Sequence, residues 1–388
     1  MKKISIVHIL GAINSGGAER FVVDLCNQLA KNNLYQVNLI CLCKNNIEDT
    51  IINEISPNVN YISFNKNSGF SLLTLIKLTY WLIRNKPIIV HTHLNSFEYL
   101  YGYLLINSRS KFFHTLHNMA QYECPNFFII KYLRTFFYKQ NKVKAITISK
   151  NGSETYQQYH HLNNDTIIAN GRPHMQLTSK CNELIKKYKN NSESFLLLHI
   201  GRLSEEKNQR LLILAVQKFN QLEHRKCKLL MIGIGNELLG NELKQLAKAD
   251  NHIEFLGLKR NIADYLSIAD AFCLSSNFEG MPIVIIEALS MGCIPISTAV
   301  GGVPQMISHG KTGFLSKDLS VDSYCHTLKQ ALLSLDKEQI IKNCTEEFKN
   351  KYHIKIAAND YLKAYALSLG IETAQIIPQS AQLEFESI

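Results

Sequence analysis

Apolar residues recur along the chain in two alternating rhythms. Short runs rich in β-branched residues, such as ISIVHIL from residue 4 and IIVHTH from residue 88, are typical of buried strands. Between such runs, apolar positions recur three or four residues apart, as in FVVDLCNQLAKN from residue 21, and this spacing predicts amphipathic helices. Strands that alternate with helices predict parallel sheets covered by helices on both faces.

The alternation is interrupted once, which divides the chain into two domains. The polar stretch GRPHMQLTSKCNELIKKYKNNSES resembles a linker with one short helix, and a second alternating series then starts with SFLLLHIG. We therefore predict an α/β protein with two Rossmann-like, doubly wound domains, at 1–172 and 190–352. In such folds ligands bind beyond the carboxyl ends of the strands.

The aromatic segment between KFFHTLH and AITIS is interpreted as an insertion.

Composition narrows the class of protein. Of the 388 residues, 46% are hydrophobic and 19% charged, which is enough for a large buried core. The start, KKISIVHIL, is too short and too β-branched for a secretion signal, and no apolar run is long enough for a membrane span. The ten cysteines lack C-x-x-C or zinc spacing. These features predict reduced core cysteines in a cytoplasmic protein.

The net charge of +10 lies almost wholly in the first half. Residues 1–172 contain 18 Lys/Arg and 9 Asp/Glu, whereas the remaining residues contain 24 and 23. A basic first domain is compatible with attraction to an anionic membrane or polynucleotide, and equally with simple solubility.

Two glycine-rich loops follow strand-like runs. Gly16 and Gly17 lie where the first strand gives way to a helix, and a helix N-terminus favours an anion; the alternative is a flexible connection. Gly233 and Gly235, with Glu254 further on, resemble a nicotinamide-cofactor loop. The third glycine of that motif is missing, so a dinucleotide site is disfavoured.

Two cations follow another strand. Arg202 comes directly after Gly201, and Lys207 stands five residues further, near a helix start. The pair suits a diphosphate, because Arg offers a planar fork and Lys a point charge. The alternative is two solvated charges that pair with Glu205 and Glu206.

The stretch FEGMPIVIIEALSMGCIPIS places two glutamates around a Gly-Met-Pro turn. Glu279 precedes Pro282, whereas Glu287 lies within an apolar run, where a carboxylate is costly without a partner. Two carboxylates suit the hydroxyls of a sugar or ribose. The alternative for Glu287 is an ion pair with a buried Arg or Lys.

Four histidines of the first half, His91, His93, His114 and His117, raise the question of a metal site. His91 and His93 share one face of a strand, but no acidic residue lies close enough in sequence to complete a familiar ligand set. We therefore expect no metal, and expect His117 to bond a ligand.

Several segments together resemble glycosyltransferase family 4: GGAER, GRLSEEK, IGIGNEL, FEGMPIVIIEALSMGCIPISTAVGG and HGKTGFL. The resemblance runs from residue 4 to about 370. It implies the GT-B fold, with two Rossmann-like domains facing across a cleft, and a last helix, about 353–370, that packs back on the first domain. It also implies retention of the anomeric configuration without a metal.

For individual residues, the resemblance implies a donor site. Gly16 and Gly17 lie beside the donor diphosphate, and Arg202 and Lys207 hold it. The other implied donor contacts are Glu279 and His117 to the sugar, Glu287 to the ribose, and the backbone of Gly280, Met281 and Ile283 near phosphate and sugar. The expected catalytic set is Glu279, His117, Arg202 and Lys207.

The chain departs from the family pattern at two places. Gln305 stands where an acid often follows Gly-Gly-x-Pro, and Arg172-Pro173 follow the Asn170-Gly171 turn in place of an apolar residue and an acid. Neither removes an expected donor contact.

The resemblance implies a retaining, metal-independent transferase that moves a sugar from a UDP or GDP donor and needs no cofactor. The expected acceptor is a glycan or polyprenyl-linked glycan of a bacterial capsule, O-antigen or lipopolysaccharide. The basic, aromatic segments FSLLTLIKLTYWLIRNK and NFFIIKYLRTFFYKQNK favour peripheral contact with the inner membrane surface. The alternative is two ordinary amphipathic core helices with solvated lysines. No nucleic-acid motif is present. A sugar-nucleotide epimerase, an NAD-dependent dehydrogenase and a non-enzymatic basic binding protein remain as alternatives.

Overall fold

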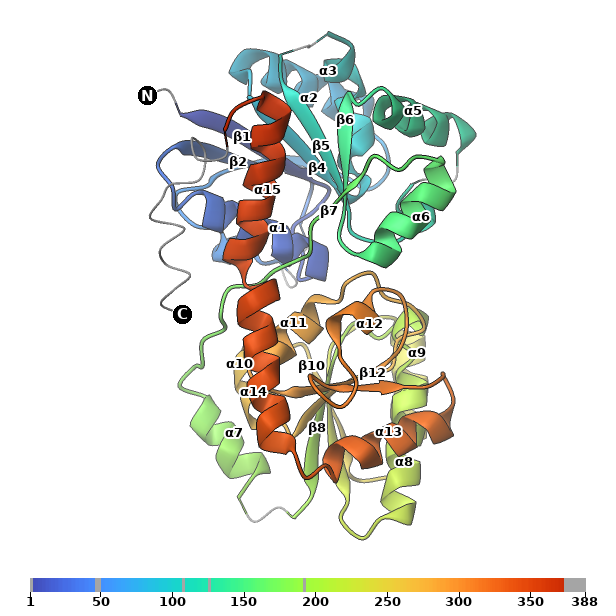
Figure 1. The fold of residues 1–388 in the computed structure, drawn as a ribbon. Helices are drawn as coiled ribbons and strands as arrows, with labels where there is room; N and C mark the ends of the chain where they lie inside the picture. The colour runs from blue at the N-terminus through green and yellow to red at the C-terminus, as the bar shows by residue number, and fades with distance from the viewer. Residues whose placement is uncertain (1–2, 46–49, 107–108, 125–126, 191–192, 373–388) are drawn as a thin grey trace. The chain divides into compact units, whose positions relative to one another are not determined.

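The computed structural model describes residues 3–45, 50–106, 109–124, 127–190 and 193–372. It forms two compact units (Figure 1). Unit 1 joins Met1–Pro173 to Tyr352–Ile388, and unit 2 is His174–Lys351.

Unit 1 is built on a seven-stranded sheet in the order β3-β2-β1-β4-β5-β6-β7, in which every neighbouring pair is parallel. Its strands are β1 (Ile4–Leu10), β2 (Tyr35–Cys43), β3 (Asn60–Lys66), β4 (Ile89–His93), β5 (Lys111–Leu116), β6 (Val143–Thr147) and β7 (Thr166–Ile167). Its helical elements are α1 (Gly17–Leu29), η1 (Ile52–Glu54), α2 (Leu72–Asn85), η2 (Leu94–Leu100), α3 (Tyr101–Ile106), α4 (Ala120–Glu123), α5 (Phe128–Lys139), α6 (Lys150–His160) and α15 (Ile354–Leu369).

Alternate residues of the strands of unit 1 pack against different helices. Val7 and Ile9 of β1 join a buried apolar cluster that includes Leu78 of α2 and Phe137 of α5. The intervening His8 lies on the other face of the sheet. Both faces are therefore covered, which explains why the strands read as almost continuous apolar runs.

The chain leaves and re-enters unit 1 side by side. The backbone N–H of Arg172 donates to the Tyr352 carbonyl at 2.9 Å, and the N–H of Ile354 donates to the Arg172 carbonyl at 2.8 Å. The Arg172 side chain forms a buried ion pair with Asp24 of α1. This pair gives a structural role to the residue that departs from the family pattern. The last helix, α15, packs on α1.

Unit 2 contains a six-stranded parallel sheet in the order β10-β9-β8-β11-β12-β13. Its strands are β8 (Phe195–Ile200), β9 (Cys227–Ile232), β10 (Ile253–Gly257), β11 (Ala271–Leu274), β12 (Ile294–Thr298) and β13 (Phe314–Ser316). Its helical elements are α7 (Cys181–Tyr188), η3 (Glu205–Lys207), α8 (Gln209–Leu222), α9 (Glu237–Ala247), α10 (Ile262–Ile268), α11 (Ile283–Ser290), α12 (Val303–Met306), α13 (Val321–Leu332), α14 (Lys337–Glu347) and the π-helical turn η4 (Phe348–Tyr352). Two parallel α/β sheets confirm the predicted fold class.

The expectation for the aromatic segment between β5 and β6 was incomplete. This segment, interpreted from the sequence as an insertion, contains α5, a regular helix with Arg134 and Phe137 buried.

The cysteines form no disulfides and are mostly buried, as expected for core residues. Within the described residues, no helix is both long and apolar enough to cross a membrane.

Candidate active site

Unit 2 brings together two of the expected catalytic residues directly. Lys207 and Glu279 follow β8 and β11, neighbouring strands of the sheet, and the Lys207 Nζ lies 2.5 Å from the Glu279 Oε1. The hydroxyl of Ser276 donates to the same carboxylate oxygen at 2.6 Å. Lys207 therefore pairs with Glu279, and the predicted alternative partners Glu205 and Glu206 are not its ion-pair partners.

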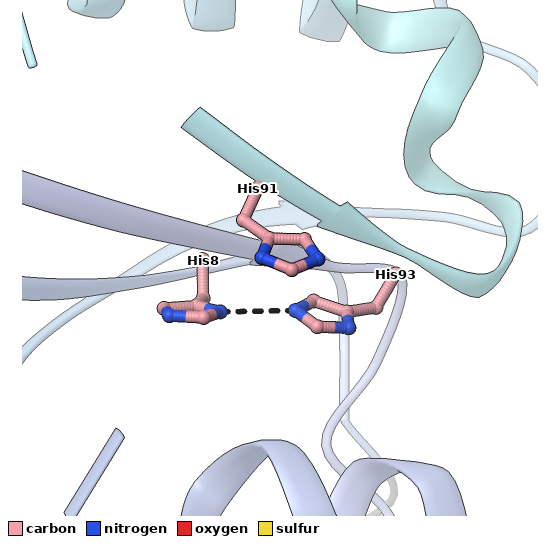
Figure 2. Close-up of side chains that lie close together, drawn as sticks. All are labelled: His8, His91 and His93. Carbon is pink, nitrogen blue, oxygen red and sulfur yellow. Dashed lines mark hydrogen bonds between the residues drawn. The ribbon is translucent and has the colours of Figure 1, made fainter. Parts of the chain in front are cut away.

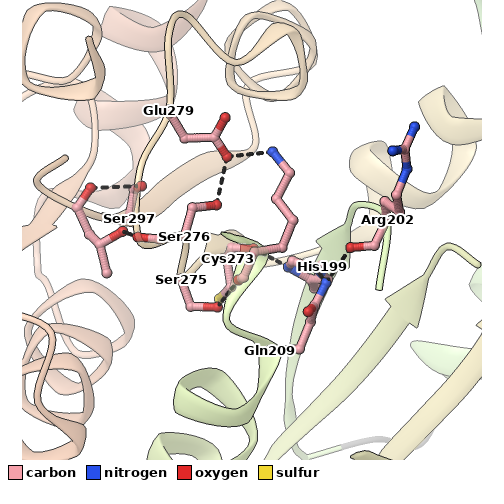
Figure 3. A network of polar contacts seen from close by, with 10 residues as sticks. His199, Arg202, Gln209, Cys273, Ser275, Ser276, Glu279 and Ser297 are labelled. Atoms are coloured by element: carbon pink, nitrogen blue, oxygen red, sulfur yellow. Dashed lines mark hydrogen bonds and ion pairs between the residues drawn. The ribbon is translucent and has the colours of Figure 1, made fainter. Parts of the chain in front are cut away.

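The backbone around Arg202 is held by a chain of buried polar groups. The amide of Gln209 donates to the Arg202 carbonyl at 2.7 Å and lies 3.3 Å from the His199 Nε2. The His199 Nδ1 donates to the Cys273 carbonyl at 3.0 Å. Burial lowers the pKa of His199 to about 4, so the ring is neutral and its Nε2 accepts from Gln209. The Arg202 side chain is exposed and extends away from Gln209 (Figure 3).

The loops after β8 and β11 are bonded into one structure. The N–H of Asn277 donates to the Glu206 carbonyl at 2.8 Å, and the hydroxyl of Ser275 donates to the Asn208 carbonyl at 2.9 Å. Asn208 itself adopts a left-handed conformation (φ 45°) and caps α8. These bonds hold the backbone of Lys207 in place relative to the loop that carries Glu279.

Two glycines of the disfavoured dinucleotide loop serve packing. A Cβ on Gly233 would lie 1.9 Å from the Gly201 carbonyl oxygen, and one on Gly235 would lie 2.2 Å from that of Leu203. These glycines allow the loop after β9 to approach the loop that carries Arg202. Glu254 accepts a hydrogen bond from Tyr188 at 3.1 Å, so its carboxylate is engaged with α7.

Glu287 and the expected backbone contacts lie on and just before α11. Pro282 is the N-cap residue of the helix, which begins at Ile283, and Gly280 and Met281 lie in the preceding bend. Glu287 is buried, with 7% of its surface exposed, and lies in the second turn of α11. Unit 2 thus carries seven of the predicted site residues: Arg202, Lys207, Glu279, Gly280, Met281, Ile283 and Glu287.

The other three expected site residues belong to unit 1. Gly16 is the N-cap of α1, which begins at Gly17, and follows the loop after β1. His117 follows β5 directly and is 8% exposed.

A carboxyl group that was not predicted from the sequence lies beside His117. Glu123 is buried and accepts a hydrogen bond from the backbone N–H of His117 at 2.9 Å. Burial raises the pKa of Glu123 to about 8, although Arg134 and the backbone N–H oppose the shift. The carboxyl group is therefore mainly protonated at neutral pH, and no spacing in the sequence indicates this contact.

Family models match both halves of the chain. The model described as "Glycosyltransferase Family 4" matches residues 15–172, and the model described as "Glycosyl transferases group 1" matches residues 181–348. The chain belongs to glycosyltransferase family 4. The resemblance stated from the motifs is thereby confirmed.

Individual members of the family differ in how much of the chain they match. The N-acetyl-alpha-D-glucosaminyl L-malate synthase of Bacillus anthracis is 29% identical over 187 residues, 47% of this chain and 47% of that protein, so the chain spans about half the length of this relative. The UDP-Gal:alpha-D-GlcNAc-diphosphoundecaprenol alpha-1,3-galactosyltransferase of Escherichia coli is 25% identical over 382 residues, 91% of this chain and 94% of that protein.

Among solved structures, the Anabaena protein HepE in complex with UDP and glucose superimposes with a TM-score of 0.76 at 17% identity. The match covers 94% of this chain and 99% of that one. At this identity the likeness concerns the fold alone, and it agrees with the GT-B fold predicted from the sequence.

Proposed function

We propose that the protein is a retaining, metal-independent glycosyltransferase that moves a sugar from a nucleoside-diphosphate donor to a lipid-linked glycan. The observation that carries the proposal is the bonded group of Lys207, Glu279 and Ser276, on the loops that also carry Arg202 and lead into α11. A cationic loop joined to a carboxylate at the carboxyl ends of parallel strands suits an activated sugar with a diphosphate leaving group.

The cations would act on the leaving group. Cleavage of the bond between the anomeric carbon and the phosphate builds negative charge on the departing diphosphate. Arg202 and Lys207 bind that charge more strongly than they bind the intact donor, which lowers the barrier. The first amides of α11 add partial positive charge in unit 2. The assignment of Gly16 and Gly17 to the same diphosphate rests on the family resemblance alone.

The carboxylates would hold the sugar and ribose. Both bonds of Glu279 go to its Oε1, so its Oε2 is the oxygen we assign to a hydroxyl of the donor sugar. Glu287 is assigned to the ribose hydroxyls and His117 to the sugar. No residue is assigned as a covalent nucleophile, so we infer front-face attack, in which the leaving phosphate takes the acceptor proton. The electrostatic role given to a metal in other transferases falls here to Arg202 and Lys207.

The relatives support the choice of substrates. The Escherichia coli relative is named for a UDP-galactose donor and an acceptor linked to diphosphoundecaprenol, and HepE binds UDP and glucose. We therefore propose a UDP or GDP sugar as donor and a polyprenyl-linked glycan as acceptor, in the synthesis of a capsule, O-antigen or lipopolysaccharide.

A thermal-shift screen tests donor binding. UDP, GDP, ADP and their common sugars are added singly to the full chain. A ligand at a hundred times its Kd stabilises the native state by about 2.7 kcal/mol. The diphosphate and sugars of one of the three bases should therefore raise Tm clearly. If no nucleoside diphosphate or its sugar raises Tm at millimolar concentration, the proposed function is wrong.

Unit 1 also carries exposed aromatic and aliphatic side chains that suit a membrane surface. Around α5, Phe128 is 82% exposed, Ile129 69% and Tyr132 62%. Neither α5 nor α2, where Leu73 and Tyr80 are more than 60% exposed, contains an acidic residue. Apolar side chains beside lysines and arginines favour insertion at an anionic lipid surface, and we propose that unit 1 docks there to reach its acceptor.

Vesicle co-sedimentation tests this docking. We expect the double variant Phe128→Ser/Ile129→Ser to lower binding to phosphatidylglycerol vesicles at least fivefold, because two exposed apolar side chains no longer insert. Leu238→Ser is the matched control, since Leu238 of unit 2 is 77% exposed and lies outside the proposed surface. Equal binding of the double variant and wild type, or no binding of the wild type at low salt, would contradict membrane docking.

A further inference from the structure

The sheet of unit 2 has a topological switch point between β8 and β11. From β8 the chain passes outward through β9 to β10, and it then returns to the other side of β8 for β11, β12 and β13. In open α/β sheets ligands bind at such a point, in the crevice beyond the carboxyl ends of the strands. Lys207 and Glu279 come from the loops on its two sides, so the bonds that hold these loops affect the candidate site directly.

A side chain continues the link between the two strands where their backbone pairing ends. The pairing of β8 with β11 reaches Leu198 and Phe272. The next residues, His199 and Cys273, are joined through the imidazole, whose Nδ1 lies 3.0 Å from the Cys273 carbonyl oxygen (Figure 3). His199 therefore connects β8 to β11 at the switch point.

The partner of His199 fixes the position of its proton. Burial lowers the pKa of His199 to about 4, so the ring is neutral and carries one N–H. A backbone carbonyl only accepts, so the Nδ1 holds that proton and the Nε2 has a lone pair. The Gln209 Nε2 lies 3.3 Å from this Nε2 and 2.7 Å from the Arg202 carbonyl oxygen. Because both neighbours are acceptors, the amide nitrogen of Gln209 donates one hydrogen to each.

The opposite orientation of the Gln209 amide is disfavoured by the same two neighbours. It would place the amide oxygen against the Arg202 carbonyl and the lone pair of His199, both of which repel it. In the observed orientation the Gln209 Oε1 has no hydrogen-bond partner among the described residues. A buried oxygen without a partner is tolerated better than a buried N–H without one. The hydrogen bonds from Cys273 to Arg202 therefore have one defined order.

The buried histidines of unit 1 have no such defined order. His8 of β1 lies beside His91 and His93 of β4 (Figure 2), and the His8 Nδ1 lies 2.9 Å from the His93 Nε2. The ring nitrogens of His91 bond the hydroxyls of Tyr365 and Thr115. Imidazoles and hydroxyls can each donate or accept, so these contacts fix no tautomer.

The side chains of His199 and Gln209 act on the site from below the Arg202 loop. His199 is completely buried, and Gln209 is 1% exposed. The backbone before Arg202 packs on the imidazole, because a Cβ on Gly201 would lie 3.3 Å from the His199 Nε2. Any effect of these two residues on a ligand must therefore pass through the backbone of Arg202.

We propose that His199 and Gln209 are positioning residues that hold the Arg202 backbone where its guanidinium can bind the donor diphosphate. The role of the guanidinium rests on the function proposed above, whereas the order of the hydrogen bonds is a property of the protein without ligand. Without the N–H groups of Gln209, the Arg202 carbonyl loses this bond and the loop after β8 can shift. We expect donor-diphosphate binding to weaken about tenfold, because a misplacement of about 1 Å is costly in a preorganised site.

Calorimetric titration of the full chain tests the proposal with a nucleoside diphosphate and the monophosphate of the same base. Gln209→Met retains the length of the side chain but has no N–H. It should weaken diphosphate binding about tenfold and monophosphate binding by less than about twofold. His199→Leu removes the acceptor that orients Gln209 and should weaken diphosphate binding in the same way. His199→Gln offers an amide oxygen in place of the Nε2 and should restore most of the affinity.

Asn220→Leu is the matched control for a purely structural effect. Asn220 is another buried amide of α8, but it bonds the backbone of Cys227 at the amino end of β9. This variant should lower the free energy of unfolding without changing the ratio of the two affinities. If Asn220→Leu and Gln209→Met lower the ratio equally, the effect is a general consequence of destabilisation and the positioning role is wrong.

Imidazole ¹⁵N NMR of the wild type without ligand tests the order of the bonds, with His199→Gln used to assign the signal. We expect a protonated Nδ1 and an unprotonated Nε2 on His199, and the opposite tautomer would overturn the proposal. An unchanged ratio of affinities in Gln209→Met, alongside a lower ratio in Arg202→Ala, would refute the positioning role and leave the proposed function intact. If the wild type binds no nucleoside diphosphate, the proposed function fails and this role fails with it.

Discussion

Alanine at Arg202 or at Lys207 is expected to lower the rate of sugar transfer about a hundredfold. Removing one fixed group that stabilises charge in a transition state typically costs ~3 kcal/mol. Because the charge develops on the leaving diphosphate, the loss should appear in kcat as well as in donor affinity. Steady-state kinetics with the donor found in the screen measures both.

The chain offers a matched control for Arg202. Arg210 lies eight residues further on, in α8, and makes an exposed ion pair with Glu242 at 3.4 Å. Arg210→Ala removes the same charge from the same unit and should change kcat less than twofold. If Arg202→Ala and Arg210→Ala are equally active, the assigned role of Arg202 is wrong.

Gly301→Ala is expected to destabilise unit 2 by at least ~3 kcal/mol. Gly301 has a φ of +53°, and a Cβ there would lie 1.8 Å from the Glu279 carbonyl oxygen. A left-handed conformation costs a non-glycine residue roughly 1–2 kcal/mol, and the Glu279 backbone must also move. Chemical denaturation measures the free energy of unfolding, and donor binding should fall with it because Glu279 is displaced.

Gly310→Ala measures the cost of the left-handed conformation without a steric clash at the new Cβ. Gly310 also has a positive φ, +74°, but nothing lies within 4 Å of its ideal Cβ position. This variant should lose only ~1–2 kcal/mol. Equal losses in the two variants would show that the close approach of Gly301 to Glu279 has no energetic consequence.

The sequence predicted the parts of the fold and site that depend on local pattern. Alternating apolar runs gave two parallel α/β sheets, and cations and carboxylates placed just after strands indicated Lys207 and Glu279, which are in contact. These predictions succeeded because the carboxyl ends of parallel strands lie at one edge of a sheet. Residues that directly follow such strands therefore lie at the same edge, whatever their separation in sequence.

Contacts that depend on strand order could not be predicted in the same way. His8 lies beside His91 and His93 because β1 is the neighbour of β4 in the sheet. The periodicity of a strand shows which of its residues share a face, but not which strands lie next to it. Similarly, Gly233 and Gly235 resembled a cofactor loop because a close backbone approach requires glycine whether the neighbour is a ligand or the loop after β8.

Calorimetric titration with a nucleoside diphosphate and the monophosphate of the same base tests the central claim most directly. Charge-assisted bonds from Arg202 and Lys207 to the second phosphate should make the diphosphate bind at least about tenfold more tightly. This preference should be smaller in Arg202→Ala, because only Lys207 then holds the second phosphate. Equal affinities of the two nucleotides for the wild type, or the same preference in Arg202→Ala, would contradict the claim that this loop holds the donor diphosphate.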